Sequence, residues 1–158
     1  MSQTKELEKI LIETKAILQD ISVVEEKKFQ AAIKNHILEI EDCIKKEQAL
    51  LLRFKGVEHK RLLLQKEMQA EDMTLKQIIE TVSPEERDGL QAAFYELEHA
   101  LKVYEEIYGR AKTAIEVNLH RINTEMEALA GSPLNESVTY SVQGEKKQTP
   151  KAFTNKTI

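Results

Sequence analysis

The chain has 158 residues and a formal net charge of −4, and charged residues of both signs make up 32% of it. Such mixed charge is typical of a solvated helix surface and argues against a general nucleic-acid binder. Cys43 is the single cysteine, so an intramolecular disulfide is excluded and the cytoplasm is the expected compartment.

Helix-forming residues fill the first 130 positions, where glycine and proline are sparse and period-two alternation is hard to find. We expect an all-α fold, an elongated antiparallel bundle of three long helices plus one short helix at residues 1–130. A flexible polar tail is expected at residues 131–158. No apolar run approaches the ~20 residues of a membrane span, so no membrane insertion is expected. The charged start, with Lys5 and Glu6, does not look like an export signal.

A first helix is expected over residues 4–32, because apolar residues recur there at steps of three and four. Its stripe is formed by Leu7, Ile10, Thr14, Ile17, Ile21 and Val24, and is widened by Leu11 and Leu18. The only break signal is Lys34-Asn35-His36, in which Asn35 could cap a second helix. One continuous helix is the alternative, because neither glycine nor proline interrupts the pattern.

A second helix is expected over residues 36–70, and it contains two triplets of consecutive leucines, 50–52 and 62–64. A triplet wraps around a helix, so one neighbouring helix cannot cover it. The triplets indicate plain core at a central position in a bundle, a homo-oligomer interface, or a groove for a partner helix.

Three residues of this second helix, Glu47, Phe54 and Arg61, are spaced by sevens and share one side of it. Glu47 and Arg61 lie ~21 Å apart along the axis, which is too far for them to pair with each other. We expect water to solvate each charge, and a partner on another helix is the alternative.

A short connecting helix is expected from Met73 to Val82, followed by one long helix between Ser83 and Pro133. Ser83, Pro84 and Glu86 form a start signal, and glycine with proline closes the other end. At ~1.5 Å per residue the helix is roughly 70 Å long, so we expect it to pack lengthwise against other helices. Its stripe consists of Leu90, Phe94, Leu97, Leu101, Tyr104, Tyr108, Ala111, Ile115, Leu119, Ile122, Met126 and Leu129.

Only Glu96 and His99 resemble a metal site, because a Glu-x-x-His motif holds metal pairs in helical bundles. Such a site needs the motif twice together with further glutamates, and the sequence does not repeat it. We therefore expect no metal, no cofactor and no catalytic group. A di-metal bundle enzyme is the least favoured alternative.

The polar tail at residues 131–158 is rich in Ser, Thr, Asn, Gln and Lys. It cannot bury enough surface to offset its chain entropy alone. Val138, Tyr140 and Val142 alternate in a short β-prone string, and isolated aromatic anchors of this kind can fold onto a partner. An idle tail is the alternative.

The order of parts resembles the FlgN family of bacterial flagellar type III export chaperones. Leu38-Glu39-Ile40-Glu41 leads to Glu47-Gln48-Ala49-Leu50-Leu51-Leu52, and Arg61 follows. After the short and the long helix come Thr139-Tyr140-Ser141 and Gly144. The resemblance implies a cytoplasmic, non-enzymatic helical chaperone. It would bind the carboxy-terminal segments of the hook–filament junction proteins FlgK and FlgL, and deliver them to the export gate, where FlhA is the receptor.

By this resemblance, the client contacts fall in the carboxy-terminal part of the long helix. The client-binding candidates are Tyr104, Tyr108, Ala111, Ile115, Leu119, Ile122, Met126 and Leu129, and the export-gate or tail contacts are Val138, Tyr140 and Val142. Family members often carry two asparagines in this helix, where Tyr108 and Ala111 stand here. A self-associating helical scaffold or coiled-coil adaptor is the alternative function, and a homo-dimer is compatible with either.

Overall fold

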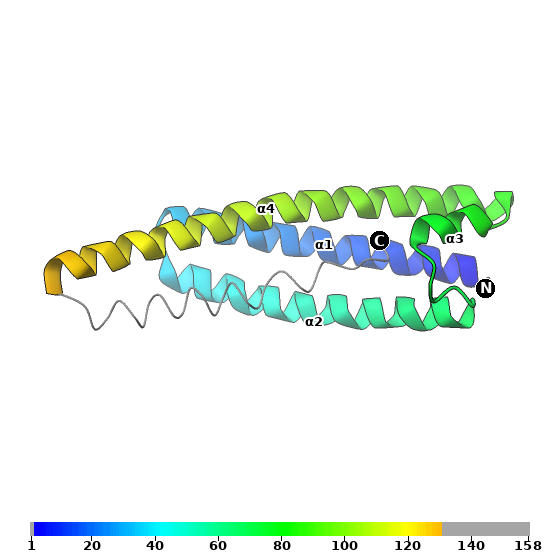
Figure 1. Cartoon of the computed structure of the whole chain (residues 1–158), viewed down its shortest axis with the longest axis horizontal. Helices are drawn as coiled ribbons and strands as arrows, with labels where there is room; N and C mark the ends of the chain where they lie inside the picture. Colours follow the sequence, from blue (N-terminus) through cyan, green and yellow to red (C-terminus); the bar gives the residue numbers. More distant parts are fainter. Residues whose placement is uncertain (1, 131–158) are drawn as a thin grey trace.

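The computed structural model describes residues 2–130, which form four helices (Figure 1). They are α1 (Gln3–Ile33), α2 (Ile37–Glu67), α3 (Leu75–Thr81) and α4 (Pro84–Ala130). The three long helices lie side by side, with α2 antiparallel to α1 and α4. The prediction of an all-α elongated bundle with three long helices and one short helix is therefore confirmed.

The break between α1 and α2 is made by the closing turn of α1. Asn35 adopts a left-handed conformation with φ 56°, and its N–H donates to the Ala32 carbonyl at 3.2 Å. The next N–H, that of His36, reaches back to the Ala31 carbonyl at 2.9 Å. These two bonds form a Schellman motif, in which asparagine can replace glycine. The prediction that Asn35 caps the second helix is wrong, since His36 is the N-cap of α2, and the continuous-helix alternative is excluded.

The end of α2 repeats this motif with a less suitable residue. Gln69 has φ 58°, and the N–H of Ala70 donates to the Gln65 carbonyl at 2.8 Å. The side chain of Gln65 donates to the carbonyls of Ala70 and Met73 at 3.3 Å each. A capping box between Thr74 and Gln77 then starts α3, so each end of this connection is fixed by hydrogen bonds.

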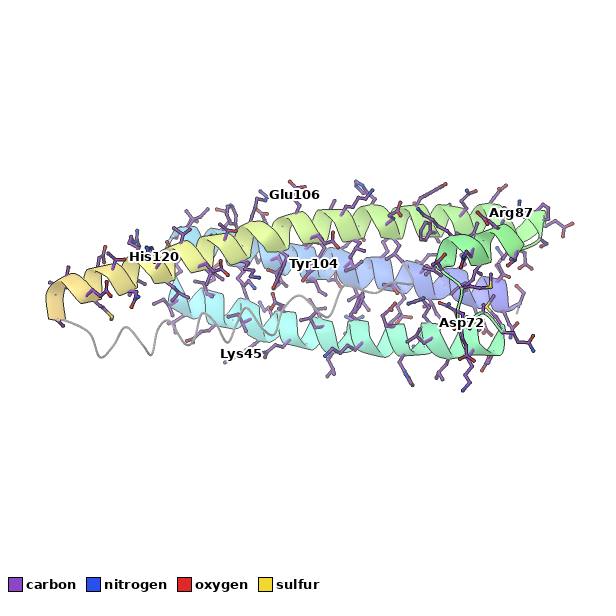
Figure 2. All side chains as sticks on the ribbon, in the orientation of Figure 1. Lys45, Asp72, Arg87, Tyr104, Glu106 and His120 are labelled. Atoms are coloured by element: carbon purple, nitrogen blue, oxygen red, sulfur yellow. The ribbon has the colours of Figure 1, made fainter. Side chains whose placement is uncertain are left out.

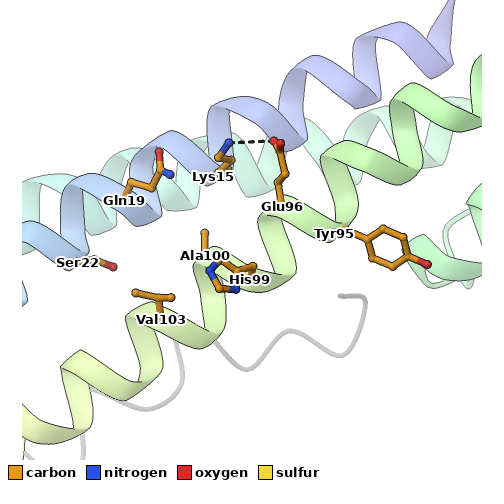
Figure 3. Close-up of a pocket in the computed structure, with 8 residues that line it drawn as sticks. All are labelled: Lys15, Gln19, Ser22, Tyr95, Glu96, His99, Ala100 and Val103. Atoms are coloured by element: carbon orange, nitrogen blue, oxygen red, sulfur yellow. Dashed lines mark hydrogen bonds and ion pairs between the residues drawn. The ribbon is translucent and has the colours of Figure 1, made fainter.

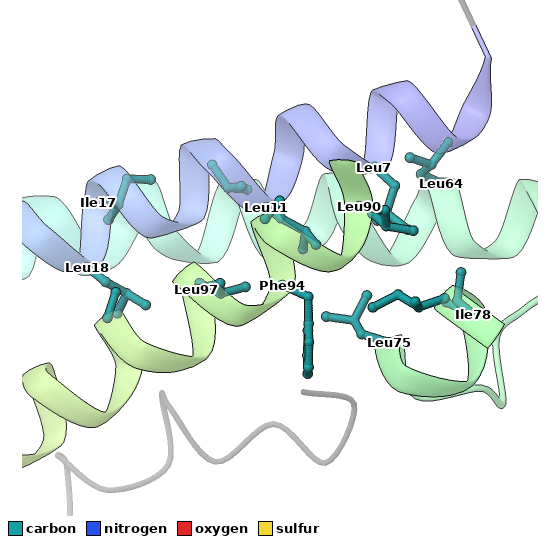
Figure 4. Packing of buried hydrophobic residues seen from close by; sticks show 14 of the residues in the cluster. Leu7, Leu11, Ile17, Leu18, Leu64, Leu75, Ile78, Leu90, Phe94 and Leu97 are labelled. Carbon is teal, nitrogen blue, oxygen red and sulfur yellow. The ribbon is translucent and has the colours of Figure 1, made fainter. Parts of the chain in front are cut away.

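The core is organised around α1, which packs against both α2 and α4, while α3 packs against α4. Figure 4 shows side chains from all four helices meeting in one apolar cluster. The predicted stripe of α1 is confirmed, since most of it is fully buried. The buried members of the cluster on α1 and α4 are Leu7, Leu11, Ile17, Leu18, Ile21, Leu90, Ala93, Phe94, Leu97, Ala100 and Tyr104.

The leucine triplets of α2 are only partly covered. Leu64 is buried and Leu50 and Leu51 pack at the edge of the core, whereas Leu52 is 72% exposed and Leu62 and Leu63 are also exposed. The plain-core interpretation therefore fails for these three leucines. The central position belongs to α1, so the interpretation of α2 as the central helix is wrong.

The long helix α4 extends beyond the ends of its neighbours. The Asn118 side-chain amide donates to the carbonyl of Ala32, one residue before the end of α1. Beyond this bond, α4 continues past the turn that joins α1 to α2 (Figure 1). The lengthwise packing predicted for the whole helix is thus confirmed up to Asn118, which is about three quarters of its length. We call residues 119–130 of α4 the overhang.

Candidate functional site

The predicted client stripe of α4 divides into an inner and an outer part. Tyr104 and Ala111 are fully buried, and Figure 2 shows Tyr104 between the long helices while Glu106 lies on the outside. Tyr108 is half-buried and stacks on Tyr104, with ring centroids 5.7 Å apart. A client could not reach Tyr104 or Ala111 while the bundle is closed.

The outer part of the stripe is progressively exposed toward the end of α4. Its half-buried members are Ile115, Leu119 and Ile122. Met126 is exposed, and Leu129 is 88% exposed. Leu119, Ile122, Met126 and Leu129 recur at steps of three and four, so they form one apolar face on the overhang.

Further exposed apolar side chains lie at the base of the overhang. Ile33 ends α1 and Ile37 begins α2, and each is more than half exposed. The bond from Asn118 to Ala32 places α4 beside this turn. Val117 is exposed as well, although the periodic stripe of α4 did not include it. The turn and the overhang together present apolar surface from three helices at one end of the molecule.

A buried group of charges lies just inside this end. Lys28 of α1 is 3.2 Å from a carboxylate oxygen of Glu25 and 2.8 Å from one of Glu47, which belongs to α2. The Lys28 ammonium also lies 5.8 Å from the centroid of the Tyr108 ring. We call Glu25, Lys28 and Glu47 the buried triad. It links α1 to α2 and borders Tyr104 and Tyr108 of α4.

Burial sets the protonation of these groups. It raises the pKa of Glu25 above its ordinary value, and the nearby Lys28 opposes this shift. Burial also raises the pKa of Tyr104, with a further contribution from the charge of Glu25. The phenol of Tyr104 is therefore neutral at physiological pH. In the buried triad, burial disfavours the ionised form of Glu25.

The solvation predicted for Glu47 and Arg61 is wrong. Glu47 is buried and bound to Lys28 on another helix. Arg61 is 0% exposed and donates to both carboxylate oxygens of Glu58 at 3.0 and 2.8 Å. Arg61 also donates to Gln65, whose side chain in turn donates to two carbonyls of the α2–α3 connection. Both charges face the bundle because the spacing by sevens puts them on the side of α2 that holds Phe54.

A second surface feature is the shallow groove between α1 and α4 (Figure 3). Lys15 of α1 binds Glu96 of α4 across it at 2.9 Å, and His99 and Val103 line it further along. The carboxylate of the Glu-x-x-His motif, which was not expected from the sequence to bind metal, is thus paired with a lysine. Within residues 2–130, no three His, Cys, Asp or Glu side chains are placed to hold a metal ion.

Two further findings concern membrane insertion and the predicted gate contacts. None of the helices at residues 2–130 is long and apolar enough to cross a membrane. The predicted gate contacts Val138, Tyr140 and Val142 lie outside the described residues.

Comparison with known proteins gives one match. The model of the family described as FlgN protein matches residues 1–148 of the chain. Neither the curated proteins nor the solved structures gave a match. The family match includes all four helices and extends into the segment beyond them.

Proposed function

Because the chain belongs to the FlgN family of flagellar export chaperones, we propose that it binds the carboxy-terminal segments of the hook–filament junction proteins FlgK and FlgL. It would then deliver them to the export gate, where FlhA is the receptor. The proposal makes the chain a cytoplasmic carrier without enzymatic activity. Val138, Tyr140 and Val142 remain the proposed contacts for the gate.

The observation that carries the proposal is the apolar face of the overhang. In the described part of the chain, no helix runs alongside α4 beyond the turn between α1 and α2. A helix that is amphipathic but unpartnered at its end is suited to receive an amphipathic segment of another protein. A client helix that packed along Leu119, Ile122 and Met126 would cover α4 there in the way that α1 covers it within the bundle.

The exposed residues at the base of the overhang would extend this proposed client site. Ile33 and Ile37 are exposed beside it, so a client helix that reached the turn would cover them together with the α4 face. Burying apolar surface contributes ~25 cal/mol per Å² before the costs of association are subtracted, so covering these exposed aliphatic side chains would favour the complex. Mutual covering of this kind also keeps the client segment from aggregating before export.

The role of the inner stripe residues differs from that of the overhang. Tyr104 and Ala111 lie inside the bundle, so we propose that they support the client site by holding α4 against α1 and α2. Ile115 and Leu119 mark the transition, because they are half-buried. Direct client contact is therefore proposed for Ile115, Leu119, Ile122, Met126 and Leu129.

Calorimetric titration with a FlgK or FlgL carboxy-terminal peptide tests the proposal. We expect binding to the full chain, and at least a tenfold loss of affinity for the Met126→Asp/Leu129→Asp variant. Ile12→Asp changes an exposed apolar residue of α1 at the other end of the bundle and serves as the matched control. No heat from the unchanged chain at tens of micromolar peptide, or equal losses in both variants, would overturn the proposal.

A further inference from the structure

The outer face of α2 carries an exposed stripe that the bundle does not use. Positions 38, 42, 45, 49, 52, 56, 59 and 63 are all exposed and follow one another in alternating steps of four and three. This is the spacing of a coiled-coil seam. The buried residues Glu47, Phe54 and Arg61 lie on the opposite side of the helix. We call these eight positions the outer α2 stripe.

The residues of the outer α2 stripe suit only one pairing of two helices. Leucines stand at its two ends, Leu38 and Leu63, and Leu52 with Ala49 occupies its middle. Leu38, Leu52 and Leu63 are 82%, 72% and 50% exposed, so the stripe presents three large apolar side chains on one face of α2. We propose that a second copy of this chain covers the stripe, with the two α2 helices antiparallel about a two-fold axis. The axis would pass between positions 50 and 51.

Facing residues are complementary in this register. Leu38 packs on Leu63 of the second copy, and Ala49 packs on its Leu52, so each apolar residue meets an apolar residue. Asp42 faces an imidazole, that of His59 of the second copy. At the flank, Glu39 lies opposite its Lys60. The two-fold axis repeats every one of these contacts, as an isologous interface requires.

A parallel pairing would bring like groups together. Asp42 would face Asp42 and Lys45 would face Lys45, and like charges opposite each other in a dry seam are unfavourable. The antiparallel register leaves one like-charged pair, Lys46 against Arg53 of the second copy, at the exposed flank. Lys46 is already bound to Asp42 of its own helix at 3.0 Å, which reduces this repulsion.

Gly56 supplies an independent observation. It lies inside α2, and a Cβ atom built on it would meet nothing within 4 Å among residues 2–130, as is also true of Gly109 in α4, so no contact in this part of the chain requires glycine there. Glycine inside a helix costs about 1 kcal/mol relative to alanine. In the antiparallel register Gly56 faces Lys45 of the second copy. The absence of a side chain would let the long lysine stem cross the seam.

Sedimentation equilibrium of the full chain tests the proposed dimer. We expect the mass to rise from 18.1 kDa toward twice that value between ~1 and ~100 µM, the concentration range in which a dimer with a Kd of about 10 µM forms. Leu52→Glu should keep the mass at that of the monomer and leave the helical circular dichroism unchanged. Ile12→Glu, on an exposed site of α1, should still dimerise. A monomer at every concentration overturns the proposal.

Cross-linking tests the register. With Leu38→Cys and Leu63→Cys in one chain, mild oxidation should give a covalent dimer, because each new thiol faces the other type across the seam. Either single variant should give little covalent dimer, because the two copies of the same position lie ~37 Å apart along antiparallel helices. The native Cys43 is buried with a raised pKa, so it contributes little to the reaction. Equal cross-linking of a single variant would overturn the register.

Discussion

Lys28 is the residue on which the junction of α1 and α2 depends most. It is the cation within reach of both Glu25 and Glu47, and all three side chains are buried. Lys28→Met leaves two buried carboxylates facing each other, so we expect the free energy of unfolding in urea to fall by ~3–5 kcal/mol.

Lys5→Met is the control for Lys28. Lys5 forms a similar i,i+3 pair with Glu8 at 3.2 Å, but more than half of its side chain is exposed. Exposed pairs contribute ~0–1 kcal/mol, so Lys5→Met should change the unfolding free energy little. Equal losses in the two variants would contradict the importance given to burial.

The raised pKa of Glu25 gives a pH dependence of known sign. Since its folded pKa lies above the ordinary value of 4.5, the folded state binds the proton more tightly than the unfolded state. The contribution of Glu25 to stability is therefore most favourable below pH 4.5 and is lost as pH rises through the folded pKa.

Comparison with Glu25→Gln isolates this contribution. The unfolding free energy of the unchanged chain minus that of the variant should rise as pH falls from neutral toward 4.5. Glu13→Gln, which removes an exposed carboxylate from the same helix, is measured alongside as the reference. A pH-independent difference for Glu25→Gln would show that the carboxylate is solvated.

The buried charges show where residue patterns fail. Glu47 and Arg61 share a side of α2 with Phe54, and this was visible in the sequence. A charge at such a position is usually solvated. The structure shows otherwise through partners that the spacing does not reveal, which are Lys28 of α1 for Glu47 and Glu58 with Gln65 of α2 for Arg61. The signal for Lys28 itself was weak but present, because Glu25 and Lys28 are one turn apart between buried apolar positions of α1.

At the scale of the elements, a substitution in the turn that ends α2 should stabilise the fold. Gln69 is held at φ 58°, where residues with a Cβ are strained and glycine is not. Gln69→Gly should raise the unfolding free energy by ~0.5–1 kcal/mol. Gln48→Gly, at an exposed position inside α2, should lower it by about 1 kcal/mol. Thermal melts of the two variants should thus shift in opposite directions, and a shared direction would contradict the assigned role of the turn.

The four helices were largely predictable because apolar residues recur at helical spacing in each of them, although α4 alone had both ends marked by proline and glycine. The predicted range 4–32 differs from α1 by one residue at each end, and the start of α4 at Pro84 agrees with its proline signal. The role of Asn35 was not predictable in the same way. Asparagine is suited both to begin a helix and to take the left-handed turn that ends one, and the backbone decides between them.

At the scale of the whole molecule, the sequence identified the stripe of α4 but not where its burial ends. Ile115 and Leu129 follow the same periodicity as Leu90 and Leu97. What separates them is the length of α1, which ends at Ile33 and leaves α4 uncovered beyond Asn118. The exposed leucines of α2 were likewise visible as triplets, yet only the packing of α2 on α1 shows which of them face outward.

Hydrogen–deuterium exchange tests, residue by residue, whether a client lies along the overhang. The free overhang should exchange fast, because few tertiary contacts protect a helix end that extends beyond its bundle. Saturating FlgK or FlgL carboxy-terminal peptide should slow exchange at residues 119–130, while residues 4–20 of α1 keep their rates. A client that binds without protecting the overhang would contradict the account.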